Sequence, residues 1–177
     1  GTALSPLHVQ KIQKLSSRVI IAYDSDPAGE KASRRAAELA LSLGMETKIA
    51  SLSQGEDPAS VIKKDPELWK KSLRESVHFV DYALERAVSN NKGRELTKEI
   101  LENVLPLISL IKSDIEKAQF VKKISLKIGV SEEIVWKDVS KIKEAEKSGT
   151  EYIKDIQTTI PNLERIMAGF VFLEESR

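Results

Sequence analysis

Hydrophobic positions in the first part of the chain alternate between the periods of strand and helix. Residues 18–23 form a continuous apolar run rich in β-branched side chains, and residues 45–52 form a second run of strand length. Such runs predict strands that are covered on both faces. Between them, residues 28–43 place alanine and leucine on one helical face, with Pro27 in the first turn and Gly44 as a stop. This order predicts a βαβ unit with two parallel strands.

A short helix is predicted before the first strand. Ser5 and Pro6 form a good N-cap and first-turn pair, and apolar residues then recur at near-helical spacing until Ser16. Two strands expose more apolar surface than one helix can cover. We therefore expect further sheet partners, from upstream of Gly1 or from another chain.

Beyond Gly55 the pattern changes to helix and turn signals alone. The predicted helices cover residues 58–64, 66–90, 96–111, 114–128, 131 to about 147, and 161–175. Pro106 lies inside the third of these helices and predicts a kink or an early end near Val104. The expected fold is therefore an α/β part, a Rossmann-like βαβ unit with parallel strands, followed by an all-α helical bundle segment. We place the first part in residues 1–70, the helical part in 71–147, and a linker with the start of a further helical region in 148–177.

Composition narrows the kinds of site and partner. The chain has no cysteine, and its two histidines, His8 and His78, have no ligand-like spacing, so we expect no zinc and assign both histidines structural or surface roles. The net charge of +1, from 28 basic and 27 acidic residues, argues against coating nucleic acid by bulk charge. No apolar run approaches the roughly 18 residues of a membrane span, and no leader pattern is present, which predicts a cytoplasmic protein.

Two aspartates stand where the first strand ends and the following helix begins. Residues two apart on an extended chain point to the same side, so Asp24 and Asp26 can direct both carboxylates at one point. Such close anions repel unless a cation lies between them, and Mg²⁺ or Mn²⁺ fits an oxygen-only ligand set. Asp57 follows the second strand, and parallel neighbours end at the same edge of the sheet, so we expect it close to the pair. Gly29 is expected to let the backbone turn tightly there.

A second interpretation assigns these aspartates to helix capping alone. Aspartate is a preferred N-cap, so Asp24 and Asp26 can cap the helix that follows, and Asp57 can cap the helix from Pro58. The residue pattern leaves both interpretations open.

Basic and aromatic residues offer weaker signals. Lys31, Arg34 and Arg35 lie on the helix after the acidic turn and could reach phosphates of a primer or nucleotide, or form an ordinary solvated face. Trp69 and Trp136 could stack on bases, but both lie on amphipathic helices among aliphatic residues, which favours packing.

Three ordered motifs resemble those of the toprim domain in bacterial DnaG-type DNA primases. They are Gly-Thr-Ala-Leu at residues 1–4, residues 19–29 with the Asp-Ser-Asp-Pro-Ala-Gly sequence, and Gly-Glu-Asp-Pro at 55–58. Residues 116–139 are similar to the helical stretch that closes the catalytic core of that family. The resemblance implies the C-terminal half of a toprim domain in 1–70, the helical subdomain in 71–147, and the start of a helicase-binding region in 148–177.

This resemblance implies a nucleotidyltransferase, a DNA-directed RNA polymerase that makes short RNA primers for DNA replication. In the family, toprim carboxylates hold divalent metal ions that bring together the RNA 3′ end and a nucleoside triphosphate. Carried over, Asp24 and Asp26 are catalytic and metal residues, and Asp57 is a metal residue. The implied partners are a single-stranded DNA template, nucleoside triphosphates, the RNA primer and a replicative DnaB-type helicase.

The chain departs from the family pattern in two places. Ala59 stands where family members usually carry a second acid, and the toprim glutamate of the family normally precedes the Gly-Thr-Ala-Leu motif. We therefore expect the chain alone to be inactive in primer synthesis. Two other functions stay open: a toprim-type DNA-cleaving enzyme, nuclease or topoisomerase, and a non-catalytic helicase-interaction module. A topoisomerase needs an active-site tyrosine, and Tyr23, Tyr82 and Tyr152 are poorly placed for that role.

Overall fold

The protein was analysed as a computed structural model that describes residues 4–24, 26–52 and 56–143. Contacts divide the chain into two compact units, Gly1–Val139 and Ser140–Arg177. All strands of the described residues belong to the first unit. Among the described residues, none of the helices is long and apolar enough to cross a membrane.

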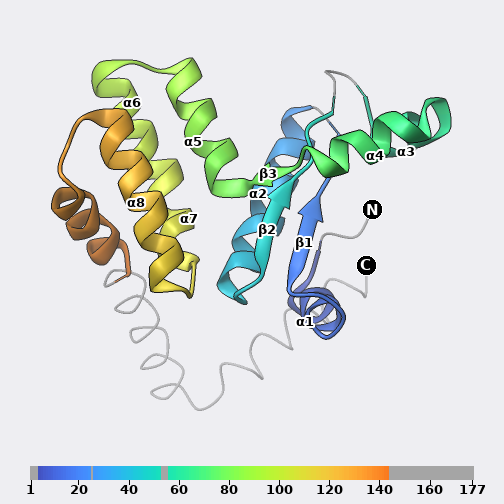
Figure 1. The fold of residues 1–177 in the computed structure, drawn as a ribbon, viewed down its shortest axis with the longest axis horizontal. Helices are drawn as coiled ribbons and strands as arrows, with labels where there is room; N and C mark the ends of the chain where they lie inside the picture. Colours follow the sequence, from blue (N-terminus) through green and yellow to red (C-terminus); the bar gives the residue numbers. More distant parts are fainter. Residues whose placement is uncertain (1–3, 25, 53–55, 144–177) are drawn as a thin grey trace, which may run out of the picture. The chain divides into compact units, whose positions relative to one another are not determined.

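A small mixed sheet forms the first part of the structure (Figure 1). Strands β1 (Arg18–Ile21) and β2 (Glu46–Ile49) run parallel, and helix α2 (Pro27–Ser42) connects them, which confirms the predicted βαβ unit. A third strand, β3 (Val77–His78), pairs antiparallel with β2, so that the strand order is β1-β2-β3.

Small side chains let α2 lie close to its neighbours. Its alanines Ala36, Ala37 and Ala40 are almost completely buried, and α2 contacts β1, β2 and α7. The helix therefore joins the sheet to the helical region. It ends at Leu43 and Gly44, whose φ of 82° lies in the left-handed region that glycine tolerates without strain.

Helix α1 (Pro6–Gln13) covers the start of the sheet. Ser5 accepts a hydrogen bond from the backbone N–H of His8, and the His8 side chain accepts one from Ser5, which is a reciprocal capping box. Val9 on this helix packs with Ala40 and Met45 in a small buried cluster. The predicted N-cap and first helix are confirmed.

The prediction of one continuous helix over residues 66–90 was wrong. The structure has α4 (Pro66–Arg74), then β3, then α5 (Phe79–Asn90). The free edge of β2 offers backbone partners to Val77 and His78, and this tertiary pairing overrides the local helical pattern. His78 then caps α5, because its Nδ1 accepts a hydrogen bond from the Val80 N–H at 3.2 Å.

Local signals placed other helices correctly. Helices α3 (Pro58–Lys64) and α8 (Asp114–Ile128) have their predicted bounds, and Gly129 ends α8 with a φ of 70°. The predicted helix 96–111 is divided into α6 (Gly93–Glu99), a π-helical turn η1 (Ile100–Val104) and α7 (Leu105–Leu110).

Pro106 explains this division. A proline has no N–H and clashes with the carbonyl four residues earlier, so the helix cannot pass through it unchanged. The N–H of Leu105 bonds instead to the carbonyl of Ile100, five residues back. The predicted kink near Val104 is confirmed. Residues 132–143 are also helical, whereas the rest of the predicted helix to 147 and the helix 161–175 lie outside the described residues.

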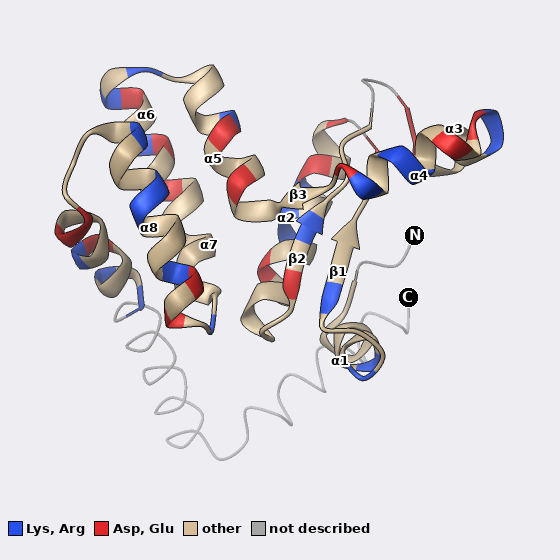
Figure 2. Cartoon of the chain, viewed as in Figure 1, with Lys and Arg blue, Asp and Glu red and all other residues tan. Residues whose placement is uncertain are grey.

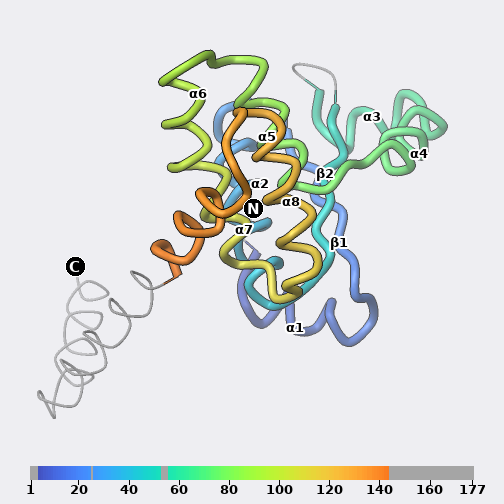
Figure 3. Tube along the Cα trace, turned by 60° about the vertical axis from the view of Figure 1, so that its left-hand side comes forward, coloured from blue at the N-terminus to red at the C-terminus, as the bar shows by residue number. Residues whose placement is uncertain are grey.

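The helical region has its own apolar core. Helices α5, α7 and α8 pack together (Figures 1 and 3) through fully buried side chains, namely Val80, Leu84, Leu107, Ile108, Val121 and Ile124. Burial of one such side chain stabilises the fold by about 1.5–3 kcal/mol. This core holds α5 in place, and residues of α5 and α2 line the candidate site.

Candidate functional site

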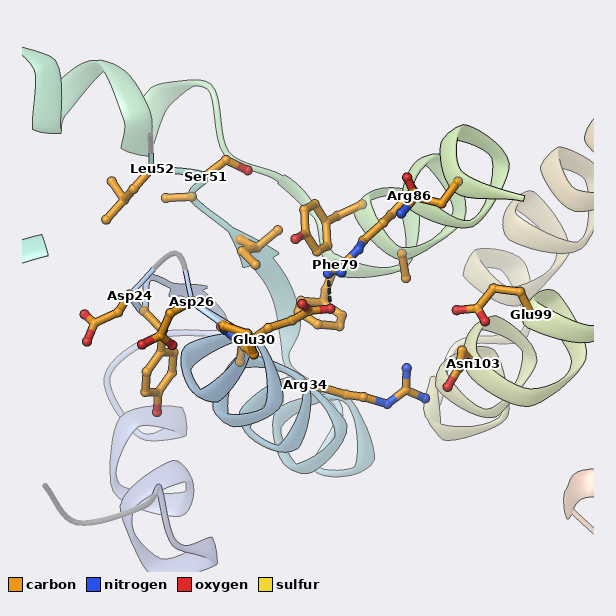
Figure 4. A pocket seen from close by; sticks show the side chains of 18 of the residues that line it. Asp24, Asp26, Glu30, Arg34, Ser51, Leu52, Phe79, Arg86, Glu99 and Asn103 are labelled. Atoms are coloured by element: carbon orange, nitrogen blue, oxygen red, sulfur yellow. Dashed lines mark hydrogen bonds and ion pairs between the residues drawn. The ribbon is translucent and has the colours of Figure 1, made fainter. Parts of the chain in front are cut away.

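The two predicted metal aspartates lie at the carboxyl end of β1. Asp24 follows the strand, and Asp26 is the N-cap of α2. Both are exposed, and both line a cavity of about 590 Å³ that continues between α2 and α5 (Figure 4). Ligands of parallel α/β sheets bind at this end of the strands.

Asp26 has a capping role. Its Oδ1 accepts a hydrogen bond from the Gly29 backbone N–H at 2.6 Å, which confirms the capping interpretation for this residue. Capping does not exhaust the carboxylate, because two oxygens provide about four acceptor positions. The carboxylate oxygens of Asp24 and Asp26 are therefore suitable ligands for a hard divalent cation that keeps several of its waters.

Gly29 makes the close approach of strand end and helix possible. It is a buried residue of the first turn of α2 rather than the turn residue that we expected. A Cβ at this position would overlap the Asp24 carbonyl oxygen and lie 3.0 Å from its carbonyl carbon and 3.1 Å from its nitrogen. The missing side chain therefore lets the helix N-terminus pack on the backbone of Asp24.

Asp57 is the N-cap of α3. Its Oδ1 accepts from the Ser60 N–H at 2.9 Å, and its Oδ2 accepts from the Ser60 hydroxyl at 2.5 Å. These bonds, first the one from the hydroxyl, hold the pKa of Asp57 below its ordinary value. Asp57 is not among the residues that line the cavity, and in the described part of the chain no three His, Asp or Glu residues form a metal-binding group. The three-acid site remains a prediction.

The predicted phosphate-binding residues have different surroundings. Arg34 lines the cavity and forms an ion pair with Glu38 at 2.9 Å, whereas Lys31 and Arg35 are exposed and do not line it. Figure 2 shows basic and acidic residues mixed along the helices, as the near-neutral charge predicted.

The structure adds Arg86 to this site. Its guanidinium forms an ion pair with Glu30 of α2, and both side chains line the cavity (Figure 4). Sequence analysis missed this pair because the two residues are 56 positions apart. The only sequence signal is a basic residue on the polar face of α5.

Uncharged side chains complete the far wall of the cavity. Tyr82 of α5 lies with its ring centroid 5.9 Å from that of Phe79, and Asn90 and Asn91 follow at the end of this helix. Asn103 comes from η1, and π-helical turns of this kind are frequent at functional sites. Trp69 and Trp136 do not line the cavity and are partly buried, which agrees with the packing role that the sequence favoured.

A second cavity, of about 840 Å³, surrounds His78. Burial lowers the pKa of His78, and the nearby Asp81 carboxylate opposes this effect. The Nε2 atom is buried and has no well-aligned hydrogen bond, although Glu116 Oε1 lies 3.3 Å away. Burial also raises the pKa of Glu116. His78 thus has an acidic neighbour, Glu116 of α8. The two residues are too far apart in the sequence for a helical spacing to indicate this contact.

Comparison with known proteins identifies two regions. Residues 1–62 match the toprim-like family, and residues 97–133 match the DnaB-helicase binding domain of primase. Over 148 residues, 81% of the chain, the sequence is 30% identical to a DNA primase of Borreliella burgdorferi, of which it covers 28%.

Solved structures show a similar fold. The zinc-binding and RNA polymerase domains of the Aquifex aeolicus primase superpose with a TM-score of 0.63 at 28% identity, over 76% of this chain and 32% of that one. A DnaG primase catalytic domain bound to single-stranded DNA gives a TM-score of 0.64 at 21% identity, over 75% and 44% of the two chains. The chain spans about a quarter of the length of the curated relatives that it matches, 24% and 28% of the first two.

Proposed function

Given that this chain is a DnaG-type DNA primase region, in which a toprim-like domain is followed by a DnaB-binding helical region, we propose that it supplies the metal site for RNA primer synthesis. The substrates are nucleoside triphosphates and the growing RNA primer, paired with a single-stranded DNA template. The observation that carries this proposal is the pair Asp24 and Asp26, which lies at the carboxyl end of β1 within the toprim-like segment and lines a cavity.

Asp24 and Asp26 are the residues that would hold Mg²⁺ or Mn²⁺, with Asp57 as a third acid. When bound, the ion would supply positive charge to the phosphate oxygens on which charge develops during nucleotidyl transfer. The reaction joins the primer 3′ oxygen to the α-phosphorus of the triphosphate and releases pyrophosphate, so no side chain needs to act as a nucleophile. The chain contributes position: the Asp26 cap holds that carboxylate at the start of α2, and the absence of a side chain at Gly29 lets the Asp24 backbone lie against the same helix end.

The helical region supports a second role, the binding of a replicative DnaB-type helicase. The match over residues 97–133 covers η1, α7 and α8. On α8, Ile115 and Leu126 are 78% and 76% exposed, and their spacing of eleven residues places them on one helix face. In a full-length primase that carries these residues, replacement of Leu126 by Asp should weaken binding of the purified helicase while primer synthesis persists.

Mutation of the acid pair tests the catalytic proposal. In a full-length primase that carries these residues, Asp24→Asn should reduce priming by several orders of magnitude while template binding persists, because stabilisation of the transferring phosphoryl group is lost. The chain alone should make no primers. Near-normal priming by the variant would overturn the metal-site role.

A further inference from the structure

The cavity beside the acid pair also contains a basic residue from the helical region. We infer that Arg86 of α5 is a phosphate-binding residue for the metal-bound nucleotide that enters this cavity. The inference rests on the proposed function, because the acid pair must bring the nucleotide into the cavity. It gives the helical region a part in substrate binding, in addition to the proposed binding of the helicase.

The position of Arg86 follows from its partner. Glu30 lies four residues after Asp26 on α2, which is about one helical turn, or ~5.4 Å along the axis. In Figure 4 the Glu30 side chain extends away from Asp26 to the Arg86 guanidinium, with which it forms the ion pair. A ligand that meets both a cation at the acid pair and the guanidinium would then extend past Glu30 along the cavity. The volume of about 590 Å³ is in the range of small-molecule sites.

The bond between Arg86 and Glu30 can be exchanged for a bond to phosphate. The two side chains are 42% and 48% exposed, and ion pairs this exposed contribute little to stability. A guanidinium binds phosphate through two parallel, charge-assisted hydrogen bonds, which are among the stronger polar contacts. Breaking the ion pair with Glu30 should therefore cost Arg86 little free energy when a phosphate replaces the carboxylate.

Charge defines the form of the ligand. The described residues that line the cavity include four acids, Asp24, Asp26, Glu30 and Glu99, and two bases, Arg34 and Arg86. This excess of negative charge disfavours a free phosphate. A divalent cation at the acid pair would balance it, so the ligand is a metal-nucleotide complex.

Arg34 is a poorer candidate than Arg86 for this contact. Its guanidinium points toward Glu99 and Asn103, away from the acid pair (Figure 4). Its ion-pair partner, Glu38, does not line the cavity. Arg86, in contrast, has its partner inside the cavity.

The competing explanation is that the pair only connects α5 to α2. Two single variants separate the explanations, because Arg86→Gln and Glu30→Gln remove the same ion pair. If the pair is only structural, both variants should have the same small effect on stability and none on ligand binding. If Arg86 binds phosphate, Arg86→Gln should weaken ligand binding and Glu30→Gln should not. Arg94→Gln serves as a control for the loss of one positive charge in the helical region, since Arg94 of α6 is exposed and does not line the cavity.

The experiment measures the Kd of ATP for the full chain by titration calorimetry in the presence of Mg²⁺. Arg86→Gln should raise the Kd roughly 10-fold or more, the value of a charge-assisted hydrogen bond. Glu30→Gln should leave the Kd unchanged or lower it, and Arg94→Gln should leave it unchanged. Equal Kd values for Arg86→Gln and the wild type, or no ATP binding at all, would overturn the inference.

A further variant distinguishes this inference from the proposed function. If Asp26→Asn abolishes ATP binding and Arg86→Gln does not change it, the metal site stands and the role of Arg86 fails. If Arg86→Gln weakens binding while Asp26→Asn and omission of Mg²⁺ have no effect, Arg86 binds phosphate and the proposed metal site fails.

Discussion

Replacement of Asp26 by asparagine separates metal binding from helix capping. In the structure the Gly29 N–H donates to Asp26 Oδ1 at 2.6 Å. An asparagine side chain has the same shape as aspartate and keeps one oxygen that can accept this hydrogen bond. Asparagine caps as well as aspartate, so the free energy of unfolding without metal should change by no more than about 0.5 kcal/mol. Asp26→Ala also removes the cap and should cost about 1 kcal/mol.

The effect on metal binding should be much larger. Loss of an outer-shell partner typically lowers metal affinity roughly 10- to 100-fold. Loss of one of the two carboxylates that bind the ion directly should lower the affinity by at least as much. At a Mg²⁺ concentration of about 100 times the wild-type Kd, the ion stabilises the fold by ~2.7 kcal/mol. A 100-fold weaker site leaves ~0.4 kcal/mol at the same concentration. For a domain of this size the stabilisation of the wild type corresponds to about 5–11 °C in Tm, and that of the variant to about 1 °C.

Thermal melts of wild type, Asp26→Asn and Asp26→Ala, each with and without Mg²⁺, measure both effects. The account predicts that asparagine removes the Mg²⁺-dependent rise in Tm and leaves the metal-free Tm nearly unchanged. If Mg²⁺ does not raise the Tm of the wild type, and Asp26→Asn has the same Tm as the wild type with and without Mg²⁺, the metal role is refuted and only the capping role remains.

Three further substitutions test other parts of the account. Gly29→Ala should lower the free energy of unfolding by about 1–3 kcal/mol in urea titrations, because the new Cβ meets the Asp24 backbone. Leu107→Ala, at a fully buried position, should cost about 2–5 kcal/mol in the same assay. Burial lowers the pKa of His78, so the neutral ring is favoured in the folded state, and stability should fall as the pH falls from about 7 to 5. His78→Asn keeps an acceptor for the Val80 N–H and should flatten the dependence of stability on pH. The raised pKa of Glu116 contributes in the opposite direction in both proteins, so subtracting the slope of the variant from that of the wild type removes this contribution.

Elements with complete local signals were predictable from the sequence. The bounds of α3 and α8 follow from a capping side chain at one end and a break at the other, and the π-helical turn follows from Pro106. Strand β3 was not predictable, because two residues carry too little periodicity and depend on the free edge of β2.

The candidate site was predictable to a similar extent. Asp24 and Asp26 are visible in the sequence because they lie at a junction of strand and helix. The pair of Arg86 and Glu30 is not visible, since it joins α5 to α2 across 56 residues of sequence. Gly29 was noticed as a glycine, but its role depends on a backbone contact that no sequence pattern shows.

The central claim is that Asp24 and Asp26 bind a divalent ion, and Mn²⁺ titration of the isotope-labelled chain by NMR tests it most directly. A bound paramagnetic ion broadens the amide signals of nearby residues. The account predicts early broadening centred on residues 22–30, reversal by excess Mg²⁺, and loss of the effect in the double variant Asp24→Asn, Asp26→Asn. Broadening that is absent from this segment, or that persists unchanged in the double variant, would contradict the claim.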